Sequence, residues 1–280
     1  MPDRLLQHTV LAAPGAEPER WLYMLHGIYG AGRNWSSIAR RVVSERTDWG
    51  VVLVDLREHG GSRGFPPPHT LGAAAGDLRV LAESTGRRTD AILGHSFGGK
   101  VALAYARDFP GRVRQLWIVD STPAASPPSG GAREMLEILR RHPGPFPSRD
   151  AAVQALVKER VPAGIAQWMA TNVEARGDEY GWRLDFDAME AMLQDFARTD
   201  LWRVVEAPTA GLELHFVRAT RSAVLTPEAA ARIEAAGRRT GRVHLHLVEG
   251  GHWLNADNPD AVVELLVEGL AGGPSGGTAA

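Results

Sequence analysis

Short apolar runs alternate with longer amphipathic stretches over the first 120 residues. The apolar runs predict strands at residues 4–12, 21–25, 51–54, 90–93 and 113–119. The stretches between them suit helices over residues 34–44, 71–83 and 100–107. The run from Val51 to Val54 contains no polar residue, which is typical of a strand buried on both faces. Strands that alternate with helices in this way predict βαβ units and a parallel sheet.

The pattern changes after Asp120. Residues 121–131 are rich in Pro, Ser and Gly and indicate a linker. From there to Glu206 no strand signal of comparable strength occurs, and helices are expected over residues 132–141, 149–160, 165–171 and 187–197. We therefore predict that residues 121–206 form a mainly helical insertion, a lid or cap. Most of its large apolar side chains are interpreted as a core of its own.

The alternation of strands and helices resumes after the insertion. Residues 212–217 and 243–248 predict two further strands. One helix is expected to begin after Thr226, because Thr226, Pro227 and Glu228 combine an N-cap with favourable first-turn residues. Another helix is expected over residues 260–270. The predicted core therefore comprises residues 1–120 and 207–271, and the low-complexity residues 272–280 are expected to form a disordered tail.

The sequence Gly-His-Ser-Phe-Gly at residues 94–98 carries the strongest candidate chemistry. It follows a predicted strand and precedes a predicted helix, and this placement is typical of a sharp turn that exposes a nucleophilic serine, here Ser96. Glycines two positions before and after the serine leave room for such a turn. The alternative is a Gly-rich turn between strand and helix whose serine is incidental.

A serine hydroxyl needs a base that takes its proton and a third group that orients the base. His252 is the candidate base, because it follows the strand expected at 243–248 on a loop that begins with Gly250 and Gly251. The alternative is a loop histidine without chemistry. His244 and His246 share one face of the same strand, but no third ligand is apparent nearby, so no metal site is predicted.

Asp120 is the candidate orienting acid. It ends the strand at 113–119, where a carboxylate faces the ligand crevice of an open α/β sheet. Its alternative role is to cap the turn into the linker. The loop that follows residues 212–217 has no carboxylate and contains Ser222 instead. Ser222 either hydrogen-bonds Asp120 or His252 as an auxiliary residue or serves only as a turn hydroxyl.

A tetrahedral intermediate requires hydrogen-bond donors for its oxyanion. One expected donor is the amide of Phe97, which follows the nucleophile. The other is the amide of Ile28, within the sequence His-Gly-Ile-Tyr-Gly at residues 26–30. His26 is expected to support this loop by hydrogen bonds and not to transfer protons. The charged loop at residues 55–62 is interpreted as structural, close to the rim of the pocket.

Composition narrows the functional classes. The 280 residues are 44% hydrophobic and 23% charged with a formal net charge of -2, which argues against a nucleic-acid partner. Cysteine is absent, which excludes disulfides, thiolate catalysis and cysteine-bound metals. No apolar run approaches the length of about 18 residues that a membrane span requires. The first residues show no secretory signal, so we expect a cytoplasmic location and, from the chemistry above, no cofactor.

The segments HGIYG, DLREHGGS, GHSFGGKVAL, IVDSTP and GGHW together resemble the α/β-hydrolase superfamily over residues 1–271. The resemblance is strongest to bacterial esterases of the YbfF type and mitochondrial hydrolases of the ABHD11 type. Members of that group place the acid after the sixth strand, as at Asp120. They also carry an Arg-x-x-x-Ser stretch, which resembles Arg218 to Ser222. The resemblance implies an α/β-hydrolase fold, with a mostly parallel sheet flanked by helices, and a carboxylester hydrolase or acyl thioesterase.

We therefore expect a small-molecule ester or thioester substrate and an acyl-enzyme formed at a Ser-His-Asp triad. The substrate pocket is expected to include His26, Tyr29, Trp168, Trp182, Phe186 and Trp253. One alternative is C–C bond hydrolysis or a lyase step on the same fold, although such enzymes usually keep the acid after the seventh strand. Another alternative is a non-catalytic binding protein that retains the fold.

Overall fold

A seven-stranded sheet forms the centre of the molecule, with strand order β1-β3-β2-β4-β5-β8-β9. The computed structural model describes residues 4–126 and 130–271. The strands of the sheet are β1 (His8–Leu11), β2 (Arg20–Leu25), β3 (Trp49–Val54), β4 (Ala91–His95), β5 (Gln115–Val119), β8 (Glu213–Ala219) and β9 (Val243–Val248). Only β1 pairs antiparallel, with β3, and the other pairs are parallel. The predicted α/β-hydrolase fold with a mostly parallel sheet is confirmed.

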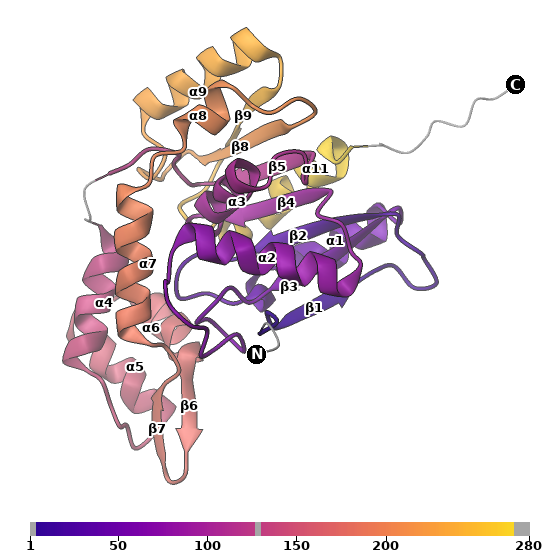
Figure 1. Cartoon of the computed structure of the whole chain (residues 1–280). Helices are drawn as coiled ribbons and strands as arrows, with labels where there is room; N and C mark the ends of the chain where they lie inside the picture. The colour runs from indigo at the N-terminus through magenta and orange to yellow at the C-terminus, as the bar shows by residue number, and fades with distance from the viewer. Residues whose placement is uncertain (1–3, 127–129, 272–280) are drawn as a thin grey trace, which may run out of the picture.

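Successive side chains of each strand point to opposite faces of the sheet, and each face buries its own apolar cluster. On β2, Leu22 and Met24 belong to one cluster, whereas Tyr23 and Leu25 belong to the other. The first cluster is covered by α1 (Ser36–Glu45) and α11 (Pro259–Gly269). The second is covered by α2 (Leu71–Thr85), α3 (Phe97–Asp108) and α9 (Pro227–Thr240) (Figure 1). Burial on both faces explains why β3 is apolar along its length.

The segment between β5 and β8 is helical, as predicted, except for one hairpin. Its helices are α4 (Gly131–Arg141), α5 (Arg149–Lys158), α6 (Ala163–Met169), α7 (Phe186–Arg198) and α8 (Trp202–Glu206), with a 3-10 turn η2 (Ala170–Asn172). No strand as strong as those of the core was expected here, and the two strands that form have only four residues each. The strands β6 (Val173–Arg176) and β7 (Glu179–Trp182) pair antiparallel in a sheet of their own (Figure 1).

The hairpin was not predictable because its strands have only four residues each and carry charged side chains. Its turn depends on Gly177, which adopts the left-handed φ of 66° that glycine tolerates best. The hairpin is anchored to the rest of the insertion through Tyr180, whose backbone exchanges two hydrogen bonds of 2.8 Å with Phe146. Backbone pairing to a distant residue thus stabilises strands that have little intrinsic apolar pattern.

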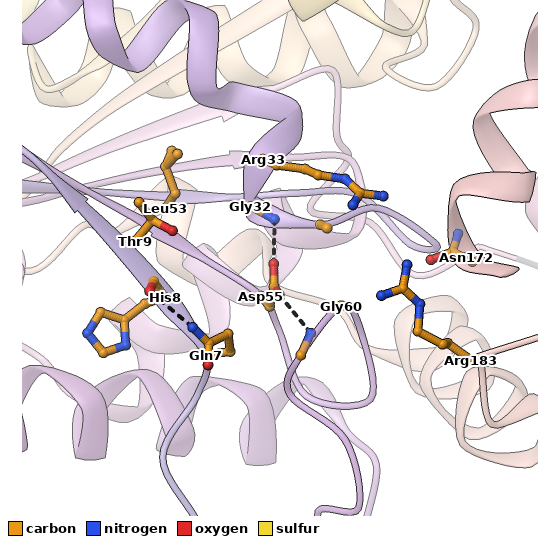
Figure 2. Close-up of a pocket in the computed structure, with 12 residues that line it drawn as sticks. Gln7, His8, Thr9, Gly32, Arg33, Leu53, Asp55, Gly60, Asn172 and Arg183 are labelled. Carbon is orange, nitrogen blue, oxygen red and sulfur yellow. Dashed lines mark hydrogen bonds between the residues drawn. The ribbon is translucent and has the colours of Figure 1, made fainter. Parts of the chain in front are cut away.

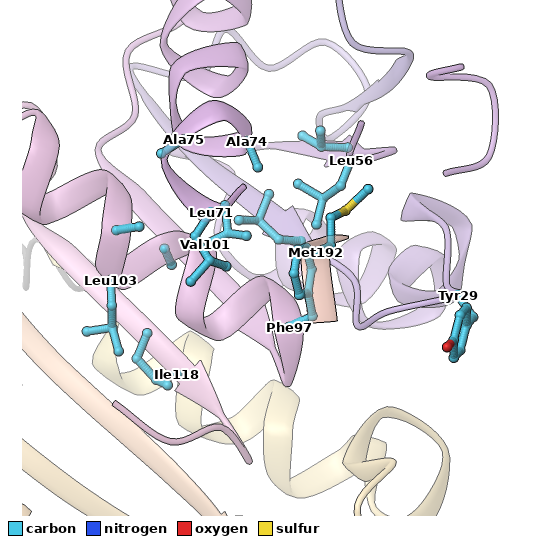
Figure 3. Packing of buried hydrophobic residues seen from close by; sticks show 14 of the residues in the cluster. Tyr29, Leu56, Leu71, Ala74, Ala75, Phe97, Val101, Leu103, Ile118 and Met192 are labelled. Carbon is cyan, nitrogen blue, oxygen red and sulfur yellow. The ribbon is translucent and has the colours of Figure 1, made fainter. Parts of the chain in front are cut away.

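The apolar core of the insertion is continuous with the core beneath the sheet. Met192 of α7 belongs to the same cluster as Leu71 of α2 and Phe97 of α3 (Figure 3). The large apolar side chains of the insertion are buried in a core, as expected. That core is not separate, because it continues into the cluster beside the sheet. Because the helices share one core, a substitution under α7 is expected to affect both parts of the molecule.

Buried polar groups also join the insertion to the core. Lys100 of α3 is fully buried, and its Nζ donates hydrogen bonds to the carbonyl oxygens of Ala124, at 2.7 Å, and Phe196, at 2.6 Å. Burial lowers the pKa of Lys100 to about 8. Asp195 of α7 accepts a hydrogen bond of 2.8 Å from the amide of Leu71 at the start of α2. These bonds fix α7 against the two helices that flank the nucleophile.

Several element boundaries differ from the sequence prediction. The first strand forms only over His8–Leu11, and β8 extends to Ala219, so Arg218 lies within the strand. The short helices α8 and α10 (Leu254–Asp257) were not predicted. The tail predicted at 272–280 lies outside the described residues. Within residues 4–126 and 130–271, no helix is long and apolar enough to cross a membrane.

Candidate active site

Ser96 occupies the turn between β4 and α3. Its backbone has φ 51° and ψ -114°, a conformation that L-residues rarely adopt and that is held only when the surroundings enforce it. A Cβ added to Gly94 would lie 2.2 Å from the carbonyl oxygen of Gly98, and a Cβ added to Gly98 would lie 2.6 Å from the carbonyl oxygen of His26. Both positions therefore require glycine for the turn to close. The turn leaves Ser96 partly exposed on the wall of a large cavity.

Asp120 and His252 meet at the same edge of the sheet, although 132 residues separate them. Asp120 directly follows β5 and is fully buried, and its Oδ2 lies 2.7 Å from Nδ1 of His252. Its other oxygen, Oδ1, accepts a longer hydrogen bond of 3.4 Å from the amide of Ala219. A buried carboxylate that accepts Nδ1–H fixes the imidazole tautomer and leaves Nε2 free to take a proton.

Ser96 and His252 line the same cavity. Among the described residues, no hydrogen bond joins the Ser96 hydroxyl to His252, and catalytic contacts of this kind often tighten only when a substrate binds. The structure thus brings the three predicted residues to one place: the serine on its turn, the histidine at the cavity wall and the acid buried behind the histidine.

His95 is a site residue that the sequence analysis missed. Its Nε2 lies 2.7 Å from the backbone carbonyl oxygen of His252, and the two rings are 4.6 Å apart. Burial lowers the pKa of His95 to about 3, so the ring is neutral and its Nε2–H donates to that carbonyl. His95 therefore holds the loop that carries His252. The signal in the sequence was a histidine immediately before Ser96, but its partner could not be read from the chain.

The loop at residues 26–30 lies beside Ser96 and presents the expected oxyanion donor. Ile28 lines the cavity, and within the described part of the chain its amide makes no hydrogen bond. The amide of Phe97 begins α3, where helix geometry leaves it without an intrahelical acceptor. The two amides are thus available to a ligand, and their distance from a bound oxyanion stays a prediction.

His26 supports this loop through both ring nitrogens. Its Nε2 accepts a hydrogen bond of 3.0 Å from the amide of Leu56, so Nδ1 carries the proton and donates to the carbonyl oxygen of Gly27 at 2.7 Å. Burial lowers the pKa of His26 to about 4, which keeps the ring neutral. The predicted supporting role of His26 agrees with this arrangement.

The loop at 55–62, interpreted from the sequence as structural, packs against the loop that contains His26. Asp55 accepts hydrogen bonds from the amides of Gly32, at 2.7 Å, and Gly61, at 2.8 Å. His59 Nδ1 donates a hydrogen bond of 2.8 Å to the carbonyl oxygen of Arg57, and its ring lies 4.9 Å from that of His26. These contacts brace the residues that follow the oxyanion loop.

The cavity that contains Ser96 has a volume of about 760 Å³ and lies between the carboxyl edge of the sheet and the insertion. Four of the expected pocket residues line it: His26, Tyr29, Trp168 and Trp253. Apolar side chains contributed by the insertion complete the wall: Met135, Ile165, Met169 and Phe196. The Tyr29 hydroxyl donates a hydrogen bond of 2.7 Å to the carbonyl oxygen of Ala132 and so joins the two sides.

Trp182 and Phe186 were expected in this pocket and do not line it. Trp182 is buried inside the insertion, where it contacts Phe146 edge to face and donates a hydrogen bond of 2.8 Å to the carbonyl oxygen of His142. Phe186 begins α7 and packs against the shared core. Both side chains pack in or against the shared core instead of lining the cavity that contains Ser96.

Ser222 has the simpler of its two expected roles. Its hydroxyl accepts a hydrogen bond of 3.2 Å from the amide of Val224, and its amide donates to the carbonyl oxygen of Ala219. Within the described ranges it makes no hydrogen bond to Asp120 or His252. Ser222 is therefore a turn hydroxyl in this structure.

His244 and His246 share a face of β9, as their spacing predicted, and pack with two residues of neighbouring strands. Nε2 of His246 lies 3.1 Å from Nδ1 of His215, and the His215 ring stacks on Trp117 at 4.0 Å. Burial lowers the pKa of His215 to about 3. In the part of the chain that the structure describes, no group of three His, Cys, Asp or Glu side chains is arranged to hold a metal ion.

The chain is similar in sequence and in fold to proteins of one known family. A model of the alpha/beta hydrolase family matches residues 22–265. The chain belongs to the alpha/beta hydrolase family. Mouse (Mus musculus) sn-1-specific diacylglycerol lipase ABHD11 is 29% identical over 259 residues, which cover 89% of this chain and 80% of the mouse protein. The expected resemblance to ABHD11-type hydrolases is confirmed, and the chain is a hydrolase.

Solved structures of this hydrolase fold superpose over almost the whole chain. A marine microorganism esterase has a TM-score of 0.79 at 24% identity and covers 95% of this chain and 99% of its own. E-2-(acetamidomethylene)succinate hydrolase has a TM-score of 0.73 at 18% identity and covers 94% of this chain and 98% of its own. At these identities the superpositions establish the shared fold, and the reaction has to be argued from the site.

Proposed function

We propose that the chain is a serine esterase that hydrolyses small-molecule carboxylic esters or acyl thioesters. The observation that carries the proposal is the 2.7 Å hydrogen bond between buried Asp120 and His252, beside the cavity into which Ser96 is turned. This arrangement supplies the three roles that an activated serine requires: nucleophile, base and orienting acid. The lipase name of the mouse relative agrees with ester chemistry.

In the acylation step of this mechanism, His252 takes the proton of Ser96 on Nε2 while Asp120 stabilises the imidazolium that forms. The Ser96 oxygen attacks the acyl carbon, and the carbonyl oxygen becomes an oxyanion bound by the amides of Ile28 and Phe97. His252 then gives its proton to the departing alcohol or thiol. The C–O or C–S bond breaks, and the acyl group remains on Ser96.

Deacylation repeats these steps with water as the nucleophile. His252 takes a proton from water, the hydroxide oxygen attacks the acyl carbon, and Ser96 leaves with the proton from His252. His95 acts here as a positioning residue, because its hydrogen bond to the His252 carbonyl limits movement of the loop. The acid product then leaves the cavity.

We propose an apolar acyl group as the part of the substrate that fills the cavity. The volume of about 760 Å³ lies within the range of about 300–1,000 Å³ typical of small-molecule sites. Its walls near the insertion are Met135, Ile165, Trp168 and Phe196, which offer apolar contacts rather than charge. The mouse relative is named for a diacylglycerol, whose acyl chains are of this apolar kind.

Hydrolysis of p-nitrophenyl esters from acetate to palmitate tests the proposal. The wild type is expected to hydrolyse at least one ester, and Ser96→Ala is expected to reduce kcat by at least about 1,000-fold. Ser44→Ala is the matched control, because Ser44 is exposed on α1 and its hydroxyl donates a hydrogen bond to the carbonyl oxygen of Arg41. A wild type that hydrolyses no ester at any length, or an active Ser96→Ala variant, would contradict the proposal.

A further inference from the structure

A second cavity lies on the other side of the loop that precedes α1. Its volume is about 140 Å³, and residues of β1, β3, the 3-10 helix η1 (Gly32–Trp35) and the insertion line it. Ala31, Gly32 and Arg33 face this second cavity, whereas Gly27 to Gly30 face the catalytic one. One continuous loop therefore separates the two cavities.

Two arginines from different parts of the fold converge on this second cavity. Arg33 belongs to η1 of the core, and Arg183 follows β7 of the insertion; Figure 2 shows both guanidinium groups reaching toward the space beside Asn172. Each donates a hydrogen bond to the carbonyl oxygen of Thr171, at 3.3 Å from Arg33 and 2.5 Å from Arg183. The same uncharged carbonyl oxygen thus accepts a hydrogen bond from both guanidinium groups.

Neither guanidinium is neutralised by an acid within residues 4–126 and 130–271. No salt bridge joins Arg33 or Arg183 to a carboxylate there, and the buried Nε of Arg183 has no hydrogen-bond partner. A buried, charged donor without an acceptor is costly and rare in folded proteins. The pKa of Arg183 is lowered, mainly by burial and then by the positive charge of Arg33.

The surrounding charges leave the cavity positive. The charges of Arg63 and Arg149 also act on Arg183, and Glu174 is the acid that acts against them. Glu174 already binds Arg63 at 2.8 Å and Arg176 at 3.4 Å. Asp55, an acid on the cavity wall itself, uses its two oxygens to accept hydrogen bonds from the amides of Gly32 and Gly61.

We propose that this second cavity binds a phosphate-class oxyanion between Arg33 and Arg183. The planar guanidinium groups of Arg33 and Arg183 present paired donors that match the oxygens of phosphate. A volume of about 140 Å³ is large enough to admit a phosphate group. The ion would connect η1 of the core to the insertion, and its binding does not depend on the chemistry of Ser96.

Thermal unfolding of the full chain in inorganic phosphate tests this site, with sodium chloride added to hold ionic strength constant. A ligand of the folded state raises Tm in a saturable way. Arg33→Gln is expected to weaken phosphate binding by about tenfold or more, since charge-assisted hydrogen bonds are lost, and Arg33 is exposed enough for the variant to fold. Arg183→Gln should have the same effect. Arg41→Gln, whose partner Asp260 is exposed, is the control that should respond like the wild type.

Glycerol 3-phosphate, as a second probe, distinguishes a free ion from the phosphate end of a larger molecule. Equal affinity for both probes supports a site that takes a phosphate end with its organic part outside. Binding of inorganic phosphate alone supports a free-ion site. A Tm that responds equally to phosphate and to chloride at the same ionic strength would overturn the proposal, and so would an Arg33→Gln variant that keeps the full response of the wild type.

Discussion

Asp120→Asn is expected to disable catalysis while the fold remains intact. The two oxygens of Asp120 have different partners: the amide of Ala219 at 3.4 Å and Nδ1 of His252 at 2.7 Å. In the variant, the side-chain oxygen keeps the Ala219 amide as its donor, so the NH2 group faces His252. That group donates to Nδ1, and the imidazole proton moves to Nε2. There it blocks acceptance of the Ser96 proton.

The expected loss is about 10⁴-fold in kcat, which the same exchange causes in a serine protease triad. It corresponds to about 5 kcal/mol of activation free energy. KM should stay within about threefold of the wild-type value, because Asp120 does not line the substrate cavity. Both constants are measured with a p-nitrophenyl ester that the wild type hydrolyses, and circular dichroism verifies the fold.

Asp257→Asn is the matched control for this substitution. Asp257 Oδ2 accepts a hydrogen bond of 2.7 Å from the amide of Gly251, directly before His252, and an asparagine oxygen can keep that bond. Its kcat should therefore stay within a few-fold of the wild type. If Asp120→Asn retained more than about a tenth of wild-type kcat, the assignment of Asp120 as the orienting acid would be refuted.

Three further predictions concern stability and the nucleophile turn. Burial lowers the pKa of His59 and His215 from 6.5 to about 3, so the unfolded chain binds more protons between these values and stability falls as pH falls. Urea unfolding at pH 8 and pH 5 should show a loss of about 2 kcal/mol for each histidine; equal stability at both pH values would contradict their burial. Burial lowers the pKa of Lys100 from 10.5 to about 8, so stability should rise with pH between these values. Lys100→Met should remove that rise in the same assay, and a rise that persists would show that another group causes it. A Cβ on Gly98 would lie 2.6 Å from the carbonyl oxygen of His26. Gly98→Ala should therefore displace the oxyanion loop and reduce kcat about 100-fold. An unchanged kcat in the same ester assay would argue against this close approach.

The sequence could predict those features that depend on local pattern. β4, the Ser96 turn and α3 follow from an apolar run, two glycines and an amphipathic stretch that are consecutive in the chain. Asp120 and His252 were predictable because parallel strands place their carboxyl ends on one edge of the sheet. The family resemblance pointed to the same three residues.

Features that depend on tertiary contacts were not predictable in this way. The role of His95 rests on a hydrogen bond to a carbonyl 157 residues away, which no local pattern encodes. Trp182 was expected in the pocket because it is large and apolar, yet its partners Phe146 and His142 direct it into the insertion. The arginine pair at Arg33 and Arg183 likewise arises only when the hairpin packs beside η1.

Labelling with a fluorophosphonate, which reacts with activated serines, tests the central claim that Ser96 is the nucleophile. Intact mass and peptide mapping of the full chain should show one adduct, on Ser96, and no adduct in Ser96→Ala. Labelling of Asp120→Asn should be much slower, because His252 can no longer take the serine proton. The account would be contradicted by a protein that remains unlabelled, or by an adduct that maps to another residue and persists in Ser96→Ala.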